Sequence, residues 1–213
     1  MIDKIHWLGH ASFRIDGASA IVYIDPWKLN NPAKADLVLV THEHFDHCSR
    51  DDIAAVVKDD TVVVGSPSAA GSLEGGVPAD RLKIVSPGEE IEARGVKIRA
   101  VAAYNTDPGR QGFHPLDESK PRVGFVVTVD GVTIYHTGDT DFVPDMEGLA
   151  PDILLVPVGG TYTMDAAQAA DAAKKIRPVL AVPMHWGDIV GARHDADKFA
   201  SLWDGEVKIK EQE

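Results

Sequence analysis

The chain has 213 residues, of which 33 are acidic and 21 basic, giving a formal net charge of −12. A chain of this length can bury roughly 70% of its unfolded surface, so we expect one compact domain over residues 1–213. The acidic balance repels polyanions at long range, which argues against nucleic acid as a partner and favours a small-molecule substrate.

Export and membrane insertion are not indicated by the sequence. No apolar run approaches the ~18 residues of a membrane helix, and the start of the chain lacks the apolar centre of a signal peptide. The single cysteine, Cys48, excludes an internal disulfide and suits a reducing compartment, so we expect a cytoplasmic protein. Cys48 is better explained as a small buried apolar residue than as a metal ligand. Nothing in the sequence specifies an oligomeric state.

The first elements form a predicted β-meander. Short strand-like runs at 5–8, 12–15 and 20–24 are separated by His10 and by an Asp-Gly turn. His10 lies between two strand-like runs, where a structural role is one interpretation. Asp25-Pro26-Trp27 ends the third strand, because proline cannot continue the ladder. The Asp25 carboxylate can form a turn, or hydrogen-bond to a nearby imidazole.

The next element carries the strongest chemical signal in the chain. Residues 37–40 are continuously apolar, which indicates a strand buried on both faces, and Thr41-His42-Glu43-His44-Phe45-Asp46-His47-Cys48 follows it. Ligands gather beyond the carboxyl ends of such strands. His42 and His44 can point to one side of an extended segment, while Asp46 and His47 reach a second point. The loop can therefore serve two metal ions; the alternative is a polar surface loop.

The remaining chain alternates β-rich and helical blocks. Ser49 is a predicted helix cap, and a brief helix lies between Pro67 and Gly75. Further strands are predicted at 61–65, 81–85, 89–93, 96–103, 123–129, 132–137, 153–158, 179–183 and 207–209, and further helices at 163–176 and 195–203. This order fits two sheets packed face to face with helices outside.

Two further polar residues follow strand-like runs in the second half. In Thr137-Gly138-Asp139-Thr140, Gly138 allows a sharp turn, and Asp139 can place one oxygen on each of two ions. Alternatively, Asp139 only forms the turn. His185 follows the strand at 179–183 and can converge on the same place. Of the other histidines, we expect His136 behind the ligands and His194 on the surface.

These motifs together resemble the metallo-β-lactamase-fold hydrolases. The resemblance rests on the H-x-H-x-D-H loop and the motifs Trp7-Leu8-Gly9-His10-Ala11-Ser12, Asp25-Pro26-Trp27, Thr137-Gly138-Asp139-Thr140 and Pro183-Met184-His185-Trp186-Gly187. It spans residues 5–190 and is greatest to the small stand-alone metal-dependent hydrolases similar to the ascorbate-phosphate lactonase type. It implies an α/β fold, a four-layer αββα sandwich of two mixed β-sheets with helices on the outer faces.

The resemblance also implies a dinuclear metal centre. Its ligands would be His42, His44, Asp46, His47, Asp139 and His185. Imidazoles and carboxylates without thiolates suit Zn²⁺ first, with Mn²⁺ or Fe²⁺ as alternatives. The ion pair would supply a bridging hydroxide that cleaves an ester-type bond in a lactone, ester or phosphoester. Asp46 would hold an ion and orient the nucleophile, and His10 would lie beside the site or the substrate.

One ligand does not follow from the resemblance directly. The family places a third imidazole of the first ion after a strand in the middle of the chain, but here the strand at 96–103 is followed by Tyr104-Asn105-Thr106. His114 is the only histidine in that interval, and Pro115 restricts its backbone. We assign His114 as the ligand, with Asn105 or Tyr104 as the alternative; an ordinary loop histidine is a further possibility.

Two other functions fit the same residues. One is a phosphodiesterase or nuclease of the same fold, which needs a basic surface that the composition disfavours. The other is a metal-binding or regulatory protein without turnover. The sequence leaves the substrate open, and the aromatic residues that we consider for the pocket walls are Trp27, Tyr104, Tyr162 and Trp186.

Overall fold

The computed structural model describes residues 1–213 and contains two β-sheets. The first sheet has six strands in chain order, with β1–β3 antiparallel and β3–β6 parallel. Its strands are β1 Ile5–Gly9, β2 Ser12–Asp16, β3 Ile21–Ile24, β4 Leu37–Val40, β5 Val62–Gly65 and β6 Leu82–Ile84. The predicted meander at the start of the chain is confirmed.

The second sheet has seven strands in the order β13-β12-β11-β10-β9-β8-β7. Neighbours from β7 to β10 are antiparallel, and those from β10 to β13 are parallel. Its strands are β7 Glu90–Ala93, β8 Val96–Ala103, β9 Arg122–Val129, β10 Val132–His136, β11 Ile153–Pro157, β12 Leu180–Met184 and β13 Glu206–Val207.

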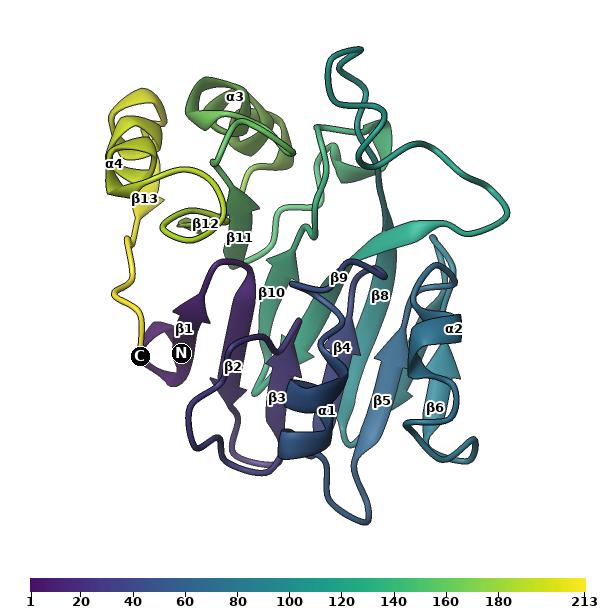
Figure 1. Cartoon of the computed structure of the whole chain (residues 1–213). Helices are drawn as coiled ribbons and strands as arrows, with labels where there is room; N and C mark the ends of the chain where they lie inside the picture. Colours follow the sequence, from purple (N-terminus) through teal and green to yellow (C-terminus); the bar gives the residue numbers. More distant parts are fainter.

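Helices lie on the outer faces of both sheets (Figure 1). The helices are η1 Ile2–Lys4, α1 Arg50–Val56, α2 Ala70–Leu73, η2 Pro144–Met146, α3 Ala166–Ile176 and α4 Arg193–Leu202. α1 and α2 pack on the first sheet, while α3 contacts β11 and α4 contacts β12. The predicted αββα sandwich of two mixed sheets is confirmed. None of these helices is both long and apolar enough to span a membrane.

Strand β4 belongs to two cores at once. Leu37 and Leu39 are in a cluster of 45 buried residues that takes in both sheets, α3 and α4. Val38 and Val40, which point to the opposite face, are in a cluster of 11 residues beneath α1 and α2. This double burial explains why β4 is continuously apolar, as the sequence analysis predicted.

Three helices and one strand have an end that differs from the prediction by more than one residue. α3 begins at Ala166 rather than at 163, because Asp165 caps it by accepting hydrogen bonds from the N–H groups of Ala167 and Gln168. α4 begins at Arg193 rather than at 195, because the carboxylate of Asp195 folds back to the N–H of Ala192. α2 keeps only four residues, and β13 is two residues long, ending at Val207.

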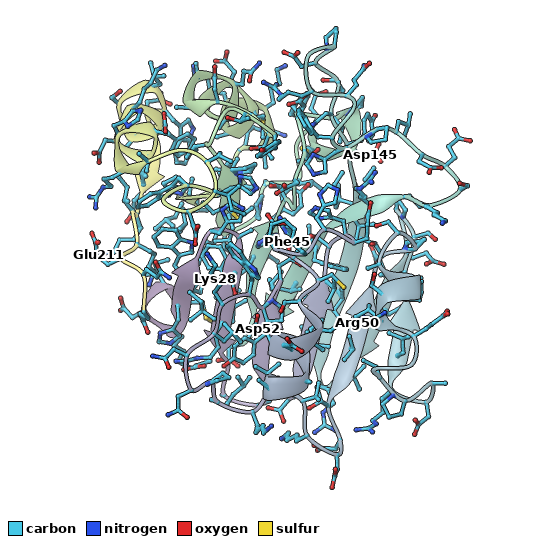
Figure 2. All side chains as sticks on the ribbon, in the orientation of Figure 1. Lys28, Phe45, Arg50, Asp52, Asp145 and Glu211 are labelled. Atoms are coloured by element: carbon cyan, nitrogen blue, oxygen red, sulfur yellow. The ribbon has the colours of Figure 1, made fainter.

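The loops that carry the candidate site leave the two sheets at the carboxyl ends of strands that run in the same direction. Within the first sheet these strands are β1, β3 and β4, and within the second β8, β10, β11 and β12. Asp52 of α1 accepts hydrogen bonds from the N–H groups of Lys28 and Leu29, which fixes the loop after β3 beside this edge (Figure 2). The topology therefore gathers polar side chains from far apart in sequence at one place.

Candidate metal centre

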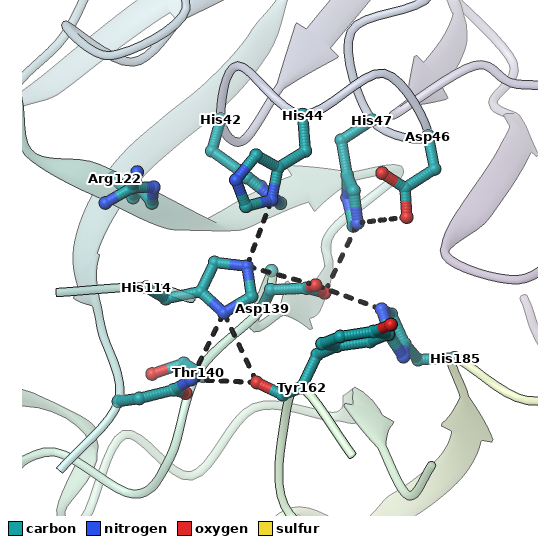
Figure 3. Close-up of polar contacts among 12 residues, drawn as sticks. His42, His44, Asp46, His47, His114, Arg122, Asp139, Thr140, Tyr162 and His185 are labelled. Carbon is teal, nitrogen blue, oxygen red and sulfur yellow. Dashed lines mark hydrogen bonds and ion pairs between the residues drawn. The ribbon is translucent and has the colours of Figure 1, made fainter. Parts of the chain in front are cut away.

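Three imidazoles form what we call the first group. His42 and His44 come from the loop after β4, and His114 from the loop between β8 and β9. The His44 Nδ1 atom lies 3.1 Å from His42 Nε2 and 3.2 Å from His114 Nε2 (Figure 3). Of the residues considered after β8, it is thus His114 that meets His42 and His44.

Asp46, His47 and His185 form the second group. Their ligand atoms lie within 4.8 Å of one another, and His10 belongs to the same cluster. The His47 Nε2 atom is 3.6 Å from Asp46 Oδ2. His185 follows β12, so this group joins the first sheet to the second.

Asp139 lies between the two groups. Its Oδ2 atom is 3.0 Å from His185 Nε2 and 3.4 Å from His114 Nε2, and its Oδ1 atom is 3.3 Å from His47 Nε2. The preceding Gly138 has φ +64°, and a Cβ atom there would lie 2.9 Å from the carbonyl oxygen of Val123. The turn that aims Asp139 inward therefore requires glycine.

A buried carboxylate orients the second group. Asp25 Oδ2 is 2.7 Å from His47 Nδ1, and Asp25 also accepts hydrogen bonds from the N–H and hydroxyl groups of Thr41. Of the two roles considered for Asp25, the structure shows the contact with an imidazole. That contact turns His47 so that Nε2 faces Asp139 and Asp46.

His10 lies directly behind Asp46. Its Nε2 atom is 3.1 Å from Asp46 Oδ2, and its ring packs on His185 with centroids 3.9 Å apart. Its backbone carbonyl accepts hydrogen bonds from the indole N–H of Trp7 and the backbone N–H of His185. His10 is buried and does not line the pocket described below, so it contacts Asp46 rather than the open space.

The loop that carries His114 is held by neutral and charged contacts. The Asn105 Nδ2 atom lies 3.2 Å from His114 Nδ1 and donates a hydrogen bond to the carbonyl of Tyr162. Asp141 accepts from the backbone of the same loop and pairs with Arg110 at 2.6 Å. Asn105, the alternative ligand in the sequence analysis, thus lies behind His114.

Burial keeps the first group neutral. It lowers the pKa of His44, lowers that of His42 well below its usual value, and lowers the pKa of His114 to about 4. Neutral imidazole is the form that binds a metal ion.

The second group attracts positive charge. Burial opposes protonation of His47, but the carboxylates of Asp139 and Asp25 outweigh it and raise the pKa of His47 well above its usual value. Burial likewise disfavours ionised Asp139, but His185 and His47 hold its pKa well below the usual range. A cation between these residues would take the place of a proton.

Three buried atoms at the centre lack a hydrogen-bond partner, namely His47 Nε2, Asp139 Oδ1 and His185 Nε2. Buried polar atoms are rarely left unpaired, so each requires an explanation. A metal ion coordinated by nitrogen and oxygen would satisfy all three, and the residues present therefore fit such an ion.

A pocket of about 240 Å³ opens over the two groups. Of the four aromatic residues considered from the sequence, only Tyr162 lines it; Trp27 lies behind Phe45, Trp186 packs on Trp7, and Tyr104 is outside. The residues that sequence reasoning missed are Phe45, Phe113 and Ile189. Two of them directly adjoin candidate ligands, His44 and His114, and that adjacency was the available signal.

The other candidates lie outside the two groups. The His136 ring contacts the carbonyl of Ala11 and accepts from the N–H of Gly138, so it supports the turn before Asp139. His194 is exposed on α4. Cys48 is buried, and burial raises the pKa of its thiol to about 11.

Comparison with known proteins gives consistent results. A model of the β-lactamase superfamily domain matches residues 4–185. The UPF0173 metal-dependent hydrolase of Thermoplasma acidophilum is 35% identical over 216 residues, covering 93% of this chain and 90% of the relative. A crystal structure of a protein from Parabacteroides distasonis, described as a metal-dependent hydrolase, superposes with a TM-score of 0.80 at 32% identity, covering 98% of this chain and 93% of the other. Igni18, a metallo hydrolase of Ignicoccus hospitalis, gives a TM-score of 0.74 at 25% identity, with coverages of 98% and 94%.

Proposed function

This chain belongs to the β-lactamase superfamily and is a metal-dependent hydrolase, and from that premise we propose that it uses two ions to cleave an ester-type bond in a small molecule. One observation carries the proposal. Asp139 lies between two groups of candidate ligands, with one oxygen 3.3 Å from His47 and the other 3.4 Å from His114. A carboxylate in this position is suited to bridge two ions.

In this proposal His42, His44 and His114 hold one ion, Asp46, His47 and His185 the other, and Asp139 both. The donor set of nitrogen and oxygen atoms without sulfur supports Zn²⁺, with Mn²⁺ or Fe²⁺ as alternatives. When bound, such a pair lowers the pKa of a water molecule and polarises the bond to be cleaved.

The protein's own residues orient the reactants. Burial disfavours ionised Asp46, but the hydrogen bond from His10 and the nearby His47 lower the pKa of Asp46 to about 2. Its carboxylate therefore stays ionised at neutral pH and can accept a hydrogen bond from the attacking water. We assign His10 the role of positioning Asp46, which it contacts at 3.1 Å.

Three broader expectations are carried forward as proposals. They are a single domain over residues 1–213, a cytoplasmic location, and a small-molecule substrate rather than nucleic acid. The net charge of −12 supports the last of these.

Elemental analysis combined with turnover tests the proposed function. Protein purified after supplementation with Zn²⁺ or Mn²⁺ should carry about two ions per chain and hydrolyse at least one substrate in a panel of lactones, thioesters, carboxylic esters and phosphodiesters. A chelator should abolish turnover, and added metal should restore it. Fewer than one ion per several chains contradicts the metal assignment. Two ions without turnover on any substrate of the panel contradict the proposed ester-type reaction.

A further inference from the structure

The pocket has two chemically distinct parts. Every charged or imidazole-bearing residue that lines it is one of the candidate metal ligands: His44, Asp46, His114, Asp139 and His185. The remaining wall consists of Phe45, Phe113, Tyr162 and Ile189. Once the ligands are engaged by metal, the phenol of Tyr162 is the one polar side-chain group left to meet a substrate.

Two of the apolar wall residues belong to aromatic pairs. Phe45 packs edge-on against Trp27 with centroids 5.9 Å apart, and Phe113 packs edge-on against Tyr162 at 4.8 Å. Phe45 is nonetheless 68% exposed and Phe113 43% exposed. Large exposed apolar side chains that gather at one concave place are a sign of a binding surface.

Ile189 is the remaining residue of the apolar wall, and its backbone conformation is strained. Its φ of +57° lies in the left-handed region, which β-branched residues very rarely adopt, and the residue is 47% exposed. Nearby Gly187 and Gly191 also have positive φ, so glycine is the residue that the loop geometry favours. An isoleucine kept in such a conformation, with much of its side chain in solvent, points to a role in binding.

No lysine or arginine side chain lines the pocket. Three cations near the pocket are already paired with carboxylates: Arg122 with Glu43, Arg110 with Asp141 and Lys28 with Asp188. A substrate anion beyond the reach of the ions would therefore face aromatic and aliphatic carbon, which leaves the charge desolvated without a partner. The volume of about 240 Å³ is also below the roughly 300–1,000 Å³ typical of pockets for drug-sized ligands.

Building on the proposed function, we propose that the substrate is a small uncharged carboxylic ester or lactone. Its apolar part binds between Phe45, Phe113, Tyr162 and Ile189, and Ile189 helps to determine specificity. One water is consumed: its oxygen bonds to the acyl carbon and the acyl C–O bond breaks. One proton of the water goes to the departing alcohol oxygen and the other is released to solvent, so the products are a carboxylate and an alcohol, or one hydroxycarboxylate from a lactone.

A series of p-nitrophenyl esters with acetyl, butanoyl and hexanoyl groups tests the proposal on metal-loaded protein, with bis(p-nitrophenyl) phosphate as the anionic comparison. We expect kcat/KM to rise by up to about fourfold for each methylene group that becomes buried, and the phosphodiester to be the poorest substrate. Equal kcat/KM across the acyl series, or a preference for the phosphodiester, overturns the proposal.

Matched variants locate the effect. Ile189→Asn introduces a residue that tolerates positive φ, so we expect an unchanged or higher melting temperature. Because the apolar side chain is lost, we expect the ratio of hexanoyl to acetyl turnover to be about fivefold smaller. Ile84→Asn makes the same change on β6, where Ile84 is 38% exposed, and should keep the wild-type ratio. Phe113→Ala should also reduce the ratio. Wild-type ratios in both Ile189→Asn and Phe113→Ala contradict the assignment of this wall.

Binding without turnover separates this proposal from the proposed function. Calorimetry on metal-loaded protein should show that hexanoate, a product-like carboxylate, binds more tightly than acetate, and that Ile189→Asn removes the difference. If no ester is hydrolysed but this preference is present, the wall assignment is supported and the proposed reaction is wrong. If esters are hydrolysed and hexanoate binds no more tightly than acetate, the wall assignment is wrong and the reaction stands.

Discussion

The two ligand groups lie side by side but are built differently. The first group, His42, His44 and His114, consists of imidazoles that burial keeps neutral. The second group contains the carboxylate of Asp46 and an imidazole, His47, whose pKa neighbouring carboxylates raise. Asp139 serves both. Since a cation gains more beside carboxylates than beside neutral rings, we expect the second group to bind its ion more tightly.

The residues that contact the two groups from behind differ in the same way, because one is charged and the other is neutral. Asp25, a buried carboxylate, holds His47 at 2.7 Å, whereas the amide of Asn105 lies 3.2 Å from His114. Charged outer partners raise the basicity of a ligating imidazole more than neutral ones. Asp139 thus lies between a second group that contains a carboxylate and a first group of neutral imidazoles. We therefore predict that the two ions bind one after the other.

Removing Asp139 should have the largest effect. In Asp139→Ala both groups lose their common carboxylate, so we expect metal content well below two ions per chain and turnover at the background rate. Elemental analysis and steady-state rates measure this, with Asp139→Asn as a control that keeps shape without charge. Retention of two tightly bound ions in Asp139→Ala would show that the groups are independent.

Asp46→Ala should separate turnover from stability. The side chain lies in a loop and fills little core volume, so the melting temperature of metal-free protein should change little, while turnover falls by about 10²–10⁴-fold, the range for a positioned acid or base. Thermal denaturation and kinetics on the same preparation are compared. An equal loss of metal-free stability would identify Asp46 as a structural carboxylate.

Removing His114 should affect the first group alone. His114→Ala deletes one of three imidazoles, so titration with Zn²⁺ should show one site weakened beyond the roughly 10–100-fold that outer partners cost, with the other unchanged. Unchanged affinity at both sites, together with a loss in Asn105→Ala, would transfer the role to Asn105.

A pair of variants behind the ligands compares the two halves directly. Asp25→Asn and Asn105→Ala should each weaken one site by about 10–100-fold, with Asp25→Asn nearer the upper limit because it removes a buried charge. The same titration measures both. A larger loss in Asn105→Ala would reverse the expected order of the two groups.

The smallest effect is expected at Cys48. It follows His47 in sequence but belongs to neither group, and its side chain packs in the cluster beneath α1 and α2. Cys48→Ala should therefore lower the free energy of unfolding by about 1 kcal/mol and leave metal content unchanged. Loss of an ion in this variant would add a thiolate to the second group.

Sequence reasoning succeeded where the hydrophobic pattern of a strand and the polar residues after it indicate the same location. The apolar run of β4 predicts burial on both faces, and the dense polar loop that follows it lies at the edge where other site loops gather. Asp139 and His185 could be placed because each follows a strand. The resemblance to metallo-β-lactamase-fold hydrolases and the αββα sandwich are both confirmed.

The pocket wall could not be predicted in the same way. Phe45, Phe113 and Ile189 meet because three loops distant in sequence converge, and nothing in a phenylalanine indicates whether it is exposed. The backbone of Ile189 even contradicts its residue type, since β-branched residues disfavour positive φ. The predicted starts of α3 and α4 were wrong for a related reason, because side-chain hydrogen bonds set these boundaries and the spacing of apolar residues does not. Asp165 is the cap residue of α3, and Asp195 is the third residue of α4.

The candidate ligands come from both sheets, and this distribution affects the degradation of the protein as well as its activity. Four of them follow β4 of the first sheet, and three follow β8, β10 and β12 of the second. Bound ions would therefore cross-link the two halves of the sandwich and bind only the folded chain. An ion present at about a thousand times its dissociation constant adds about 4 kcal/mol to the free energy of unfolding. Metal starvation would then expose the chain to proteolysis, so that metal supply controls the amount of protein in addition to its activity.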